Sequence, residues 1–327
     1  IPGNKLLIAG SGRCNITHEG NIEPFFEHYG KNHRFLKHAL LSFTNQDLID
    51  FLESNGIATL SDENGKIFPV TGKSADILNL LTRKCKENNV TICISQPVLD
   101  ISKEGQEFKV TTDSGLYSST RLIITTGGCS YPLTGSTGDG HTFACKLGHS
   151  IIPTRPALSP VFIKNFWLQD CSGISLIDVP VYLYRDHKKI STHSGDIIIT
   201  HKGLSGPGIL DFSREMQDGD ELRINITGQN PEKLRQQLIE CSDKEGKTTL
   251  IAFLHRYNIP KNLTKSLLGI INLNPEETLA TLSRDKRIRL IDTFCECSFL
   301  IDKVGGYEVA MVTTGGVSLD EISPKSI

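Results

Sequence analysis

A short glycine loop near the start of the sequence combines residue types that suit phosphate binding. Its residues are Gly10, Ser11, Gly12, Arg13, Cys14 and Asn15. Small residues let backbone N–H groups approach an anion closely, and an arginine adds charge-assisted hydrogen bonds to phosphate oxygens. A dinucleotide pyrophosphate would fit such a loop, but an ordinary turn with a surface arginine has the same spacing. Cys14 is either a reactive thiol beside Arg13 or a packing residue.

A second loop, residues 127–140, has the highest density of glycine and hydroxyl side chains in the chain. It follows the apolar run 121–126 and precedes a predicted short helix over residues 141–147. A strand, a glycine loop and a helix in this order direct backbone N–H groups at phosphate or at a flavin ring. The loop matches neither a Walker A motif nor the Gly-x-Gly-x-x-Gly order. A surface loop that caps the helix is the alternative.

A third stretch, residues 195–208, places His201 and Lys202 between a predicted strand and a helix that begins near Pro207. His201 is the catalytic candidate, as a proton relay or a substrate contact, and a polar loop residue is the alternative. The sequence has no His-x-x-x-His pair and no Gly-x-Ser-x-Gly motif. We therefore expect neither a metal centre nor a serine hydrolase.

Length and composition limit the classes of protein to which this chain can belong. The chain has 327 residues, 38% of them hydrophobic, and this length favours two domains. Its net charge of -2 gives no overall attraction to nucleic acid or membranes, although local patches are not excluded. No apolar run is long enough to span a bilayer and no signal peptide is recognisable, so we expect a cytoplasmic protein. The nine cysteines form no Cys-x-x-Cys pair, so no disulfide framework is expected. The first residue is Ile1 and not Met, which suggests a processed or truncated chain.

Hydrophobic periodicity predicts the elements that must position these motifs. Helices are expected over residues 34–54, with a break near Thr44–Asn45, over 74–87, and repeatedly between 231 and 300. Strands are expected at 90–94, 98–101, 108–112, 116–118, 179–184, 197–200 and 307–314. The run 121–126 reads as a strand buried on both faces of a parallel sheet. The prolines after Gly148 mark a domain boundary.

Five segments in sequence order resemble motifs of the BaiN-like (YhiN-type) family of FAD-dependent oxidoreductases, which are flavoproteins related to glutathione reductase. They are Lys5–Thr17 (KLLIAGSGRCNIT), Phe68–Thr71 (FPVT), Thr126–Gly140 (TGGCSYPLTGSTGDG), Thr200–Pro207 (THKGLSGP) and Thr314–Leu319 (TGGVSL). The resemblance implies an α/β fold with an incomplete FAD-binding Rossmann-like domain, residues 1–150 and 307–327. An inserted substrate-side domain with a β part and a helical part would occupy residues 151–306. The family's N-terminal Gly-x-Gly-x-x-Gly fingerprint and its late flavin-covering segment have no counterpart in this sequence.

The same resemblance implies a set of cofactor contacts. Ser11, Gly12, Arg13, Cys14 and Asn15 would lie by the flavin and pyrophosphate, Thr126, Gly127 and Gly128 would return the chain to the cofactor, and Val98 would lie near the adenine. We therefore expect an FAD-dependent oxidoreductase that transfers hydride to or from a small organic substrate at the domain interface, with reduction of a C=C bond as one reaction and NAD(P)H as a plausible donor. No nucleic-acid or membrane partner is expected. The alternative is a non-catalytic truncated fragment that at most binds a ligand or partner.

Overall fold

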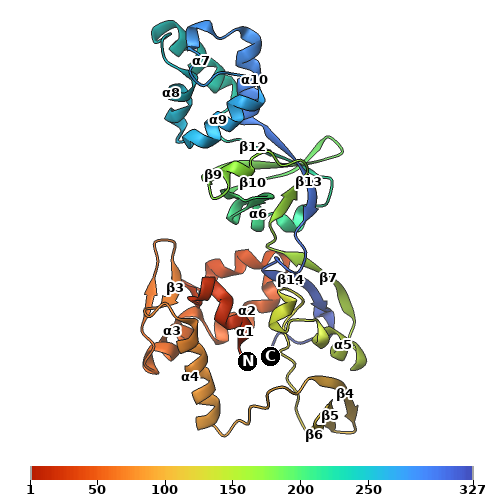
Figure 1. Cartoon of the computed structure of the whole chain (residues 1–327). Coiled ribbons are helices and arrows are strands. Elements are labelled where there is room, and N and C mark those ends of the chain that lie inside the picture. Colours follow the sequence, from red (N-terminus) through yellow and green to blue (C-terminus); the bar gives the residue numbers. More distant parts are fainter. Residues whose placement is uncertain (1, 326–327) are drawn as a thin grey trace. The chain divides into compact units, whose positions relative to one another are not determined.

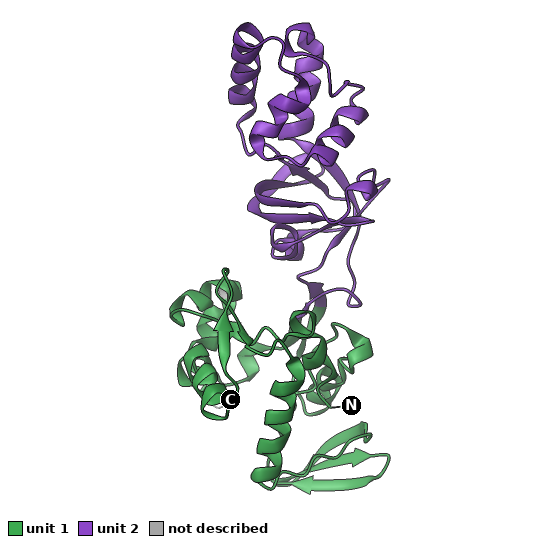
Figure 2. Ribbon diagram, turned by 60° about the vertical axis from the view of Figure 1, so that its left-hand side comes forward, with its two compact units in different colours: residues 1–154, 315–327 green, residues 155–314 purple. Residues whose placement is uncertain are grey.

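The computed structural model describes residues 2–325 and divides into two compact units. Unit 1 comprises residues 1–154 and 315–327, and unit 2 comprises residues 155–314 (Figure 2). The chain leaves unit 1 within strand β7 (Ile151–Ala157) and returns within strand β14 (Val312–Val317), and these two strands pair with each other (Figure 1). The boundaries expected from the sequence lay after residues 150 and 306.

Unit 1 contains the helices predicted over residues 34–54, 74–87 and 141–147, and in addition a short helix at its start that was not predicted. They are α1 (Asn4–Ile8), α2 (His33–Ser42), α3 (Asn45–Ser54), α4 (Ser74–Glu87) and α5 (Asp139–Lys146). The predicted break between α2 and α3 is confirmed, because a capping box starts α3. The Thr44 hydroxyl accepts a hydrogen bond from the Asp47 N–H at 3.2 Å, and the Asp47 carboxylate accepts one from the Thr44 N–H at 2.7 Å.

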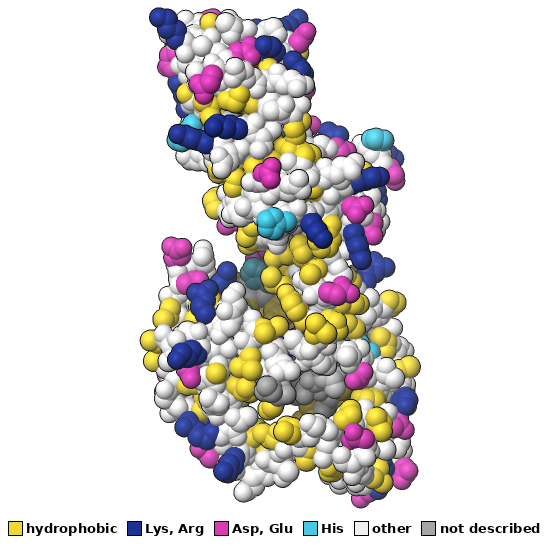
Figure 3. All heavy atoms as spheres, in the orientation of Figure 1, with side chains coloured by type: hydrophobic (Ala, Val, Ile, Leu, Met, Phe, Trp, Pro, Cys, Tyr) yellow, Lys and Arg dark blue, Asp and Glu magenta, His cyan; other side chains and the backbone are white. Residues whose placement is uncertain are grey.

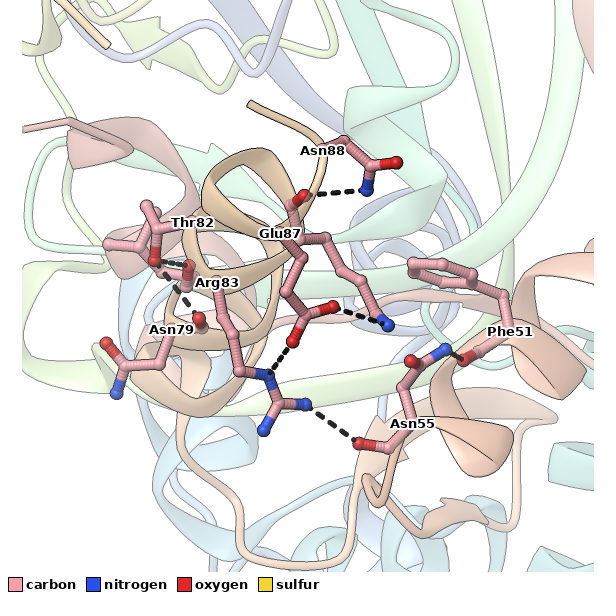
Figure 4. A network of polar contacts seen from close by, with 9 residues as sticks. Phe51, Asn55, Asn79, Thr82, Arg83, Glu87 and Asn88 are labelled. Atoms are coloured by element: carbon pink, nitrogen blue, oxygen red, sulfur yellow. Dashed lines mark hydrogen bonds and ion pairs between the residues drawn. The ribbon is translucent and has the colours of Figure 1, made fainter. Parts of the chain in front are cut away.

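Polar contacts tie the end of α3 to the side of α4 (Figure 4). The Arg83 guanidinium donates a hydrogen bond to the Asn55 carbonyl at 3.2 Å and lies 3.6 Å from the Glu87 carboxylate. The Asn55 side-chain amide donates to the Phe51 carbonyl at 2.7 Å. These bonds satisfy carbonyl groups that the end of a helix leaves without partners.

Two small sheets complete unit 1. The first has the order β1-β3-β2, and the second is the antiparallel meander β4-β5-β6, whose strands cover the predicted segments 98–101, 108–112 and 116–118. Their strands are β1 (Thr17–His18), β2 (Thr59–Ser61), β3 (Lys66–Pro69), β4 (Val98–Glu104), β5 (Glu107–Thr112) and β6 (Gly115–Ser119).

Two predicted strands, residues 90–94 and 121–126, were wrong. Neither segment belongs to a strand in the structure. Ile94 and Ile123 are 61% and 84% exposed, whereas a strand of a parallel sheet is buried on both faces. An apolar run forms such a strand only where neighbouring strands bind its N–H and C=O groups, and among the described residues no strand pairs with either segment.

Unit 2 begins as a closed antiparallel barrel with the strand order β10-β11-β8-β13-β12-β9 (Figure 1). Its strands are β8 (Val161–Ile163), β9 (Ser175–Arg185), β10 (Lys188–Ile199), β11 (Gly203–Ser205), β12 (Glu221–Ile224) and β13 (Cys297–Val304). Closure pairs the edges that an open sheet would expose. Alternate side chains such as Val181 and Leu183, each 0% exposed, fill the interior.

The helical part of unit 2 lies between β12 and β13 in sequence. Its helices are α7 (Pro231–Lys244), α8 (Leu250–Leu254), α9 (Lys261–Ile270) and α10 (Arg284–Cys295), while the short α6 (Pro207–Leu210) packs on the barrel strand β10. One hydrophobic core joins the barrel residues to helix residues such as Leu234, Leu267 and Phe294. The mixture of helices and strands confirms the predicted α/β class.

Candidate functional site

The loop from Gly10 to Asn15 has an unusual backbone. Gly10, Ser11, Gly12 and Cys14 have φ values of 56°, 57°, 84° and 62°. For the non-glycine residues Ser11 and Cys14 this left-handed conformation costs on the order of 1 kcal/mol each, so the surrounding contacts must hold it. At Gly10 a Cβ atom would lie 2.6 Å from the Asn15 nitrogen, so a side chain there would collide with the backbone. The N–H groups of Arg13 and Cys14 donate to the Gly10 and Ala9 carbonyls at 3.2 and 2.9 Å, so hydrogen bonds within the loop hold this turn.

The side chains of this loop divide into an exposed set and one buried thiol. Ser11, Arg13 and Asn15 are exposed, and the Arg13 guanidinium lies 4.5 Å from the centroid of the Phe68 ring. Cys14 is only 3% exposed, and burial raises the pKa of its thiol. Burial therefore favours packing over reactivity for Cys14, while Arg13 remains free to meet an anion.

Backbone pairing brings the second motif beside the first. The Ile16 N–H donates to the Ile67 carbonyl at 2.8 Å, and β1 continues this pairing with β3. Phe68, which contacts Arg13, is the next residue of β3. The segments Lys5–Thr17 and Phe68–Thr71 therefore form one local structure.

Lys5 connects this structure to the long glycine loop. Its ammonium group donates hydrogen bonds to the Ser130 carbonyl and to the Ser136 hydroxyl, both at 2.7 Å. Ser130 and Ser136 are 2% and 6% exposed. This role of Lys5 was not predicted, and the available signal was a lysine directly before the apolar run of residues 6–9.

A cavity of about 1090 Å³ opens beside the same glycine loop within unit 1. Its lining includes Thr126 and Gly127, the glycines Gly140, Gly315 and Gly316, the aromatic Phe108, and the basic side chains Lys103, His141, Lys146 and His149. A side chain at Gly140 would clash with the Thr126 hydroxyl, so the start of α5 packs directly on the loop. Glycine walls and basic side chains fit a large anionic ligand such as a dinucleotide.

Two of the basic side chains at this cavity already have carboxylate partners. Lys146 forms an ion pair with Asp100, and this hydrogen bond lowers the pKa of Asp100. His149 lies 3.3 Å from Glu321, and the pKa of Glu321 is lowered mainly by hydrogen bonds from Ser150. The other two basic side chains, Lys103 and His141, form no ion pair with any described residue.

The predicted site residues fall into two groups. All nine cofactor candidates lie in unit 1, whereas His201 lies in unit 2. Thr126 and Gly127 line the cavity, but Val98, Gly128 and the residues from Ser11 to Asn15 do not. Val98 starts β4 opposite Thr112. The cavity also contains residues that were not predicted, above all His141 and the pair Gly315–Gly316, whose φ values are 82° and 115°.

In residues 2–325, no three His, Cys, Asp or Glu side chains are arranged to hold a metal ion. No helix in this part of the chain is both long and apolar enough to cross a membrane.

One family model and several known proteins match nearly the whole chain. A model of the HI0933-like protein Rossmann domain matches residues 1–327. The ribosomal RNA dihydrouridine synthases of Escherichia coli and Haemophilus influenzae are 29% and 30% identical over 100% and 99% of this chain and over 79% and 80% of their own lengths. The 3-dehydro-bile acid delta(4,6)-reductase of Clostridium scindens is 25% identical over 99% of the chain and 80% of its own length.

The tight loop predicts different costs for two glycine substitutions. Gly10→Ala should destabilise the loop by more than about 1 kcal/mol, because its Cβ atom meets the backbone in addition to the strain of positive φ. Gly20→Ala is the matched control, since Gly20 has a φ of 91° but no atom within 4 Å of the added Cβ. Hydrogen exchange of the Ile16 amide should become faster in the first variant than in the second. Equal exchange in both variants would show that close packing at Gly10 does not hold the loop.

The burial of Cys14 predicts slow alkylation. At pH 8, iodoacetamide should modify Cys14 at least about tenfold more slowly than the exposed Cys93 and Cys145, because its raised pKa leaves less thiolate and the fold blocks access. Mass spectrometry of peptides from timed reactions measures the three rates in one sample. A rate for Cys14 that matches Cys93 would instead identify it as a reactive thiol.

Proposed function

Since the chain belongs to the HI0933-like family of Rossmann-domain proteins, we propose that it is a flavin-dependent reductase that adds hydrogen across a carbon–carbon double bond. Its family and its reductase relative support an oxidoreductase in general. The observation that carries the finer proposal is the agreement among the names of the relatives. Dihydrouridine is uridine with its ring double bond reduced, and a delta(4,6)-reductase acts on carbon–carbon double bonds of a steroid.

The residues of unit 1 fit FAD as the cofactor. The exposed Arg13 guanidinium suits the pyrophosphate, and the walls at Gly127, Gly315 and Gly316 admit flat or extended groups at close range. When bound, the flavin supplies the hydride, and we propose NAD(P)H as its source. The chain itself holds the cofactor through these contacts and orients it against the substrate.

We propose uridine in ribosomal RNA as the substrate. Two relatives with this activity in their names match the chain at 29% and 30% identity, compared with 25% for the bile acid reductase. The proposal departs from two expectations: a small organic substrate, which the family resemblance implied, and no nucleic-acid partner, which rested on the net charge of -2. Acidic and basic side chains are interspersed on the face drawn in Figure 3, so any attraction to RNA must come from local sites.

A steroid-like enone is the second candidate substrate, supported by the relative from Clostridium scindens. Purified protein supplied with FAD and NADPH without oxygen distinguishes the two. With an unmodified ribosomal RNA transcript we expect a mass increase of two hydrogens on a uridine, and with a steroid dienone we expect no loss of its ultraviolet absorbance. Reduction of the dienone alone would favour the second candidate.

A non-catalytic fragment is the rival to any reductase. It predicts that the chain supplied with FAD shows neither a bound yellow chromophore nor a rise in melting temperature. A bound chromophore together with turnover of either substrate would exclude this rival.

The Arg13 site predicts a loss of cofactor affinity on mutation. Arg13→Ala should weaken FAD binding by about tenfold, because it removes a charge-assisted contact to phosphate that is worth about 1.5 kcal/mol. Arg34→Ala is the control, since Arg34 is an exposed arginine of α2 in the same unit. Titration of FAD fluorescence gives both dissociation constants. Unchanged affinity in the Arg13 variant would remove this residue from the site.

A further inference from the structure

We propose that a pocket on the barrel of unit 2 binds one nucleotide of single-stranded RNA, an inference that rests on the proposed ribosomal RNA substrate. The pocket has a volume of about 480 Å³ and lies wholly within unit 2. The side chains that matter to its chemistry are Phe166, Gln169, His201, Lys202 and Asp302. They combine an aromatic ring, an amide, two basic groups and a carboxylate in one place.

The two basic groups sit on a fixed hairpin tip. His201 and Lys202 are the exposed residues between β10 and β11, and the N–H and hydroxyl groups of Thr200 both donate to the Gly203 carbonyl at 2.9 Å across the turn. The Lys202 carbonyl accepts a hydrogen bond from the Ile163 N–H at 3.0 Å, which ties the tip to β8. The backbone that carries both side chains is therefore held before any ligand arrives.

The Lys202 ammonium and the His201 imidazole are available to an anionic ligand. No ion pair involves His201 or Lys202 among the described residues, although Asp302 lines the same pocket. Lysine binds phosphate as a point charge, and a neighbouring histidine adds a hydrogen-bond donor. The pair therefore suits the phosphate of a nucleotide.

An aromatic platform faces the same space. Phe166 is half-buried, lines the pocket and packs against Phe299, with 6.2 Å between the ring centroids. Phe299 is 3% exposed and also stacks on Trp167 at 5.7 Å. The barrel core thus anchors the ring of Phe166, and a base stacked on an anchored ring does not have to order it first.

The polar groups of the pocket match uridine. The exposed Gln169 carries both a donor and an acceptor, which complement a carbonyl oxygen and the ring N–H on the pairing edge of uracil. The Asp302 carboxylate accepts hydrogen bonds and suits the ribose 2′-hydroxyl, the group that distinguishes RNA from DNA. The phosphate, the base and the sugar of a nucleotide thus each have a suitable partner in the pocket. A steroid has no phosphate or base for these groups to bind.

Binding of a fluorescein-labelled oligouridylate to the 327-residue chain tests this site by anisotropy. Lys202→Ala should weaken binding by about threefold to tenfold and flatten the slope of log K against log salt by about 0.7, the value for one contact to single-stranded phosphate. Phe166→Leu should weaken binding by about fivefold or more through lost stacking. Lys188→Ala is the control, because Lys188 is an exposed lysine in the β9–β10 hairpin of the same barrel.

Further arms identify the ligand and report on folding. Trp167 is the sole tryptophan, so its emission reports both the fold of each variant and the approach of a nucleotide to the pocket. Uridine monophosphate should quench it, whereas inorganic phosphate at the same concentration should not. An oligodeoxyuridylate should bind more weakly than the oligouridylate.

The outcomes separate this site from the proposed reaction. Wild-type affinity in Lys202→Ala and Phe166→Leu, or an equal loss in Lys188→Ala, overturns the nucleotide site even if ribosomal RNA is reduced. Loss of binding in the pocket variants alone supports the site. Such binding without any reduction of ribosomal RNA would refute the proposed reaction and leave the site in place.

Discussion

The contact between Lys5 and the glycine loop is the interaction on which the candidate cofactor site depends. One ammonium group holds the Ser130 carbonyl and the Ser136 hydroxyl, across separations of 125 and 131 residues. Both serine residues are buried, so these hydrogen bonds form where water competes little for the same atoms. The bond therefore connects the loop that carries Arg13 to the loop that ends at α5, and the shape of the site follows from this connection.

Much of the fold follows from local patterns in the sequence. The break between α2 and α3 is encoded by Thr44 and Asp47, which form a capping box, and α4 covers the range that its apolar spacing predicts. The resemblance to the BaiN-like family and the Rossmann-like fold class are confirmed by the match of the family model to residues 1–327. The predicted strands 90–94 and 121–126 were wrong. An apolar run is compatible with a strand, but it does not show whether a neighbouring strand is present to pair with it.

The candidate site was harder to predict than the fold. Gly127 and Arg13 were predicted because glycine-rich loops, and an arginine within one, can be recognised from residue types alone. His141 and Gly316 reach the cavity only because α5 and β14 lie beside the glycine loop, and this proximity depends on tertiary packing across more than half of the chain. His201 is an exposed residue of a hairpin tip in unit 2. Its residue type could not predict that Phe166 and Gln169 line the same pocket.

The paired strands β7 and β14 have a consequence for how this architecture can change. The chain leaves and re-enters unit 1 through one two-stranded ribbon, and a side chain at Gly315 would lie only 2.5 Å from the Pro153 carbonyl oxygen across it. An insertion whose two ends are adjacent imposes little extra closure entropy on its host, and length added within it costs little more. Unit 2 can therefore be enlarged, reshaped or exchanged during evolution with little cost to the fold of unit 1.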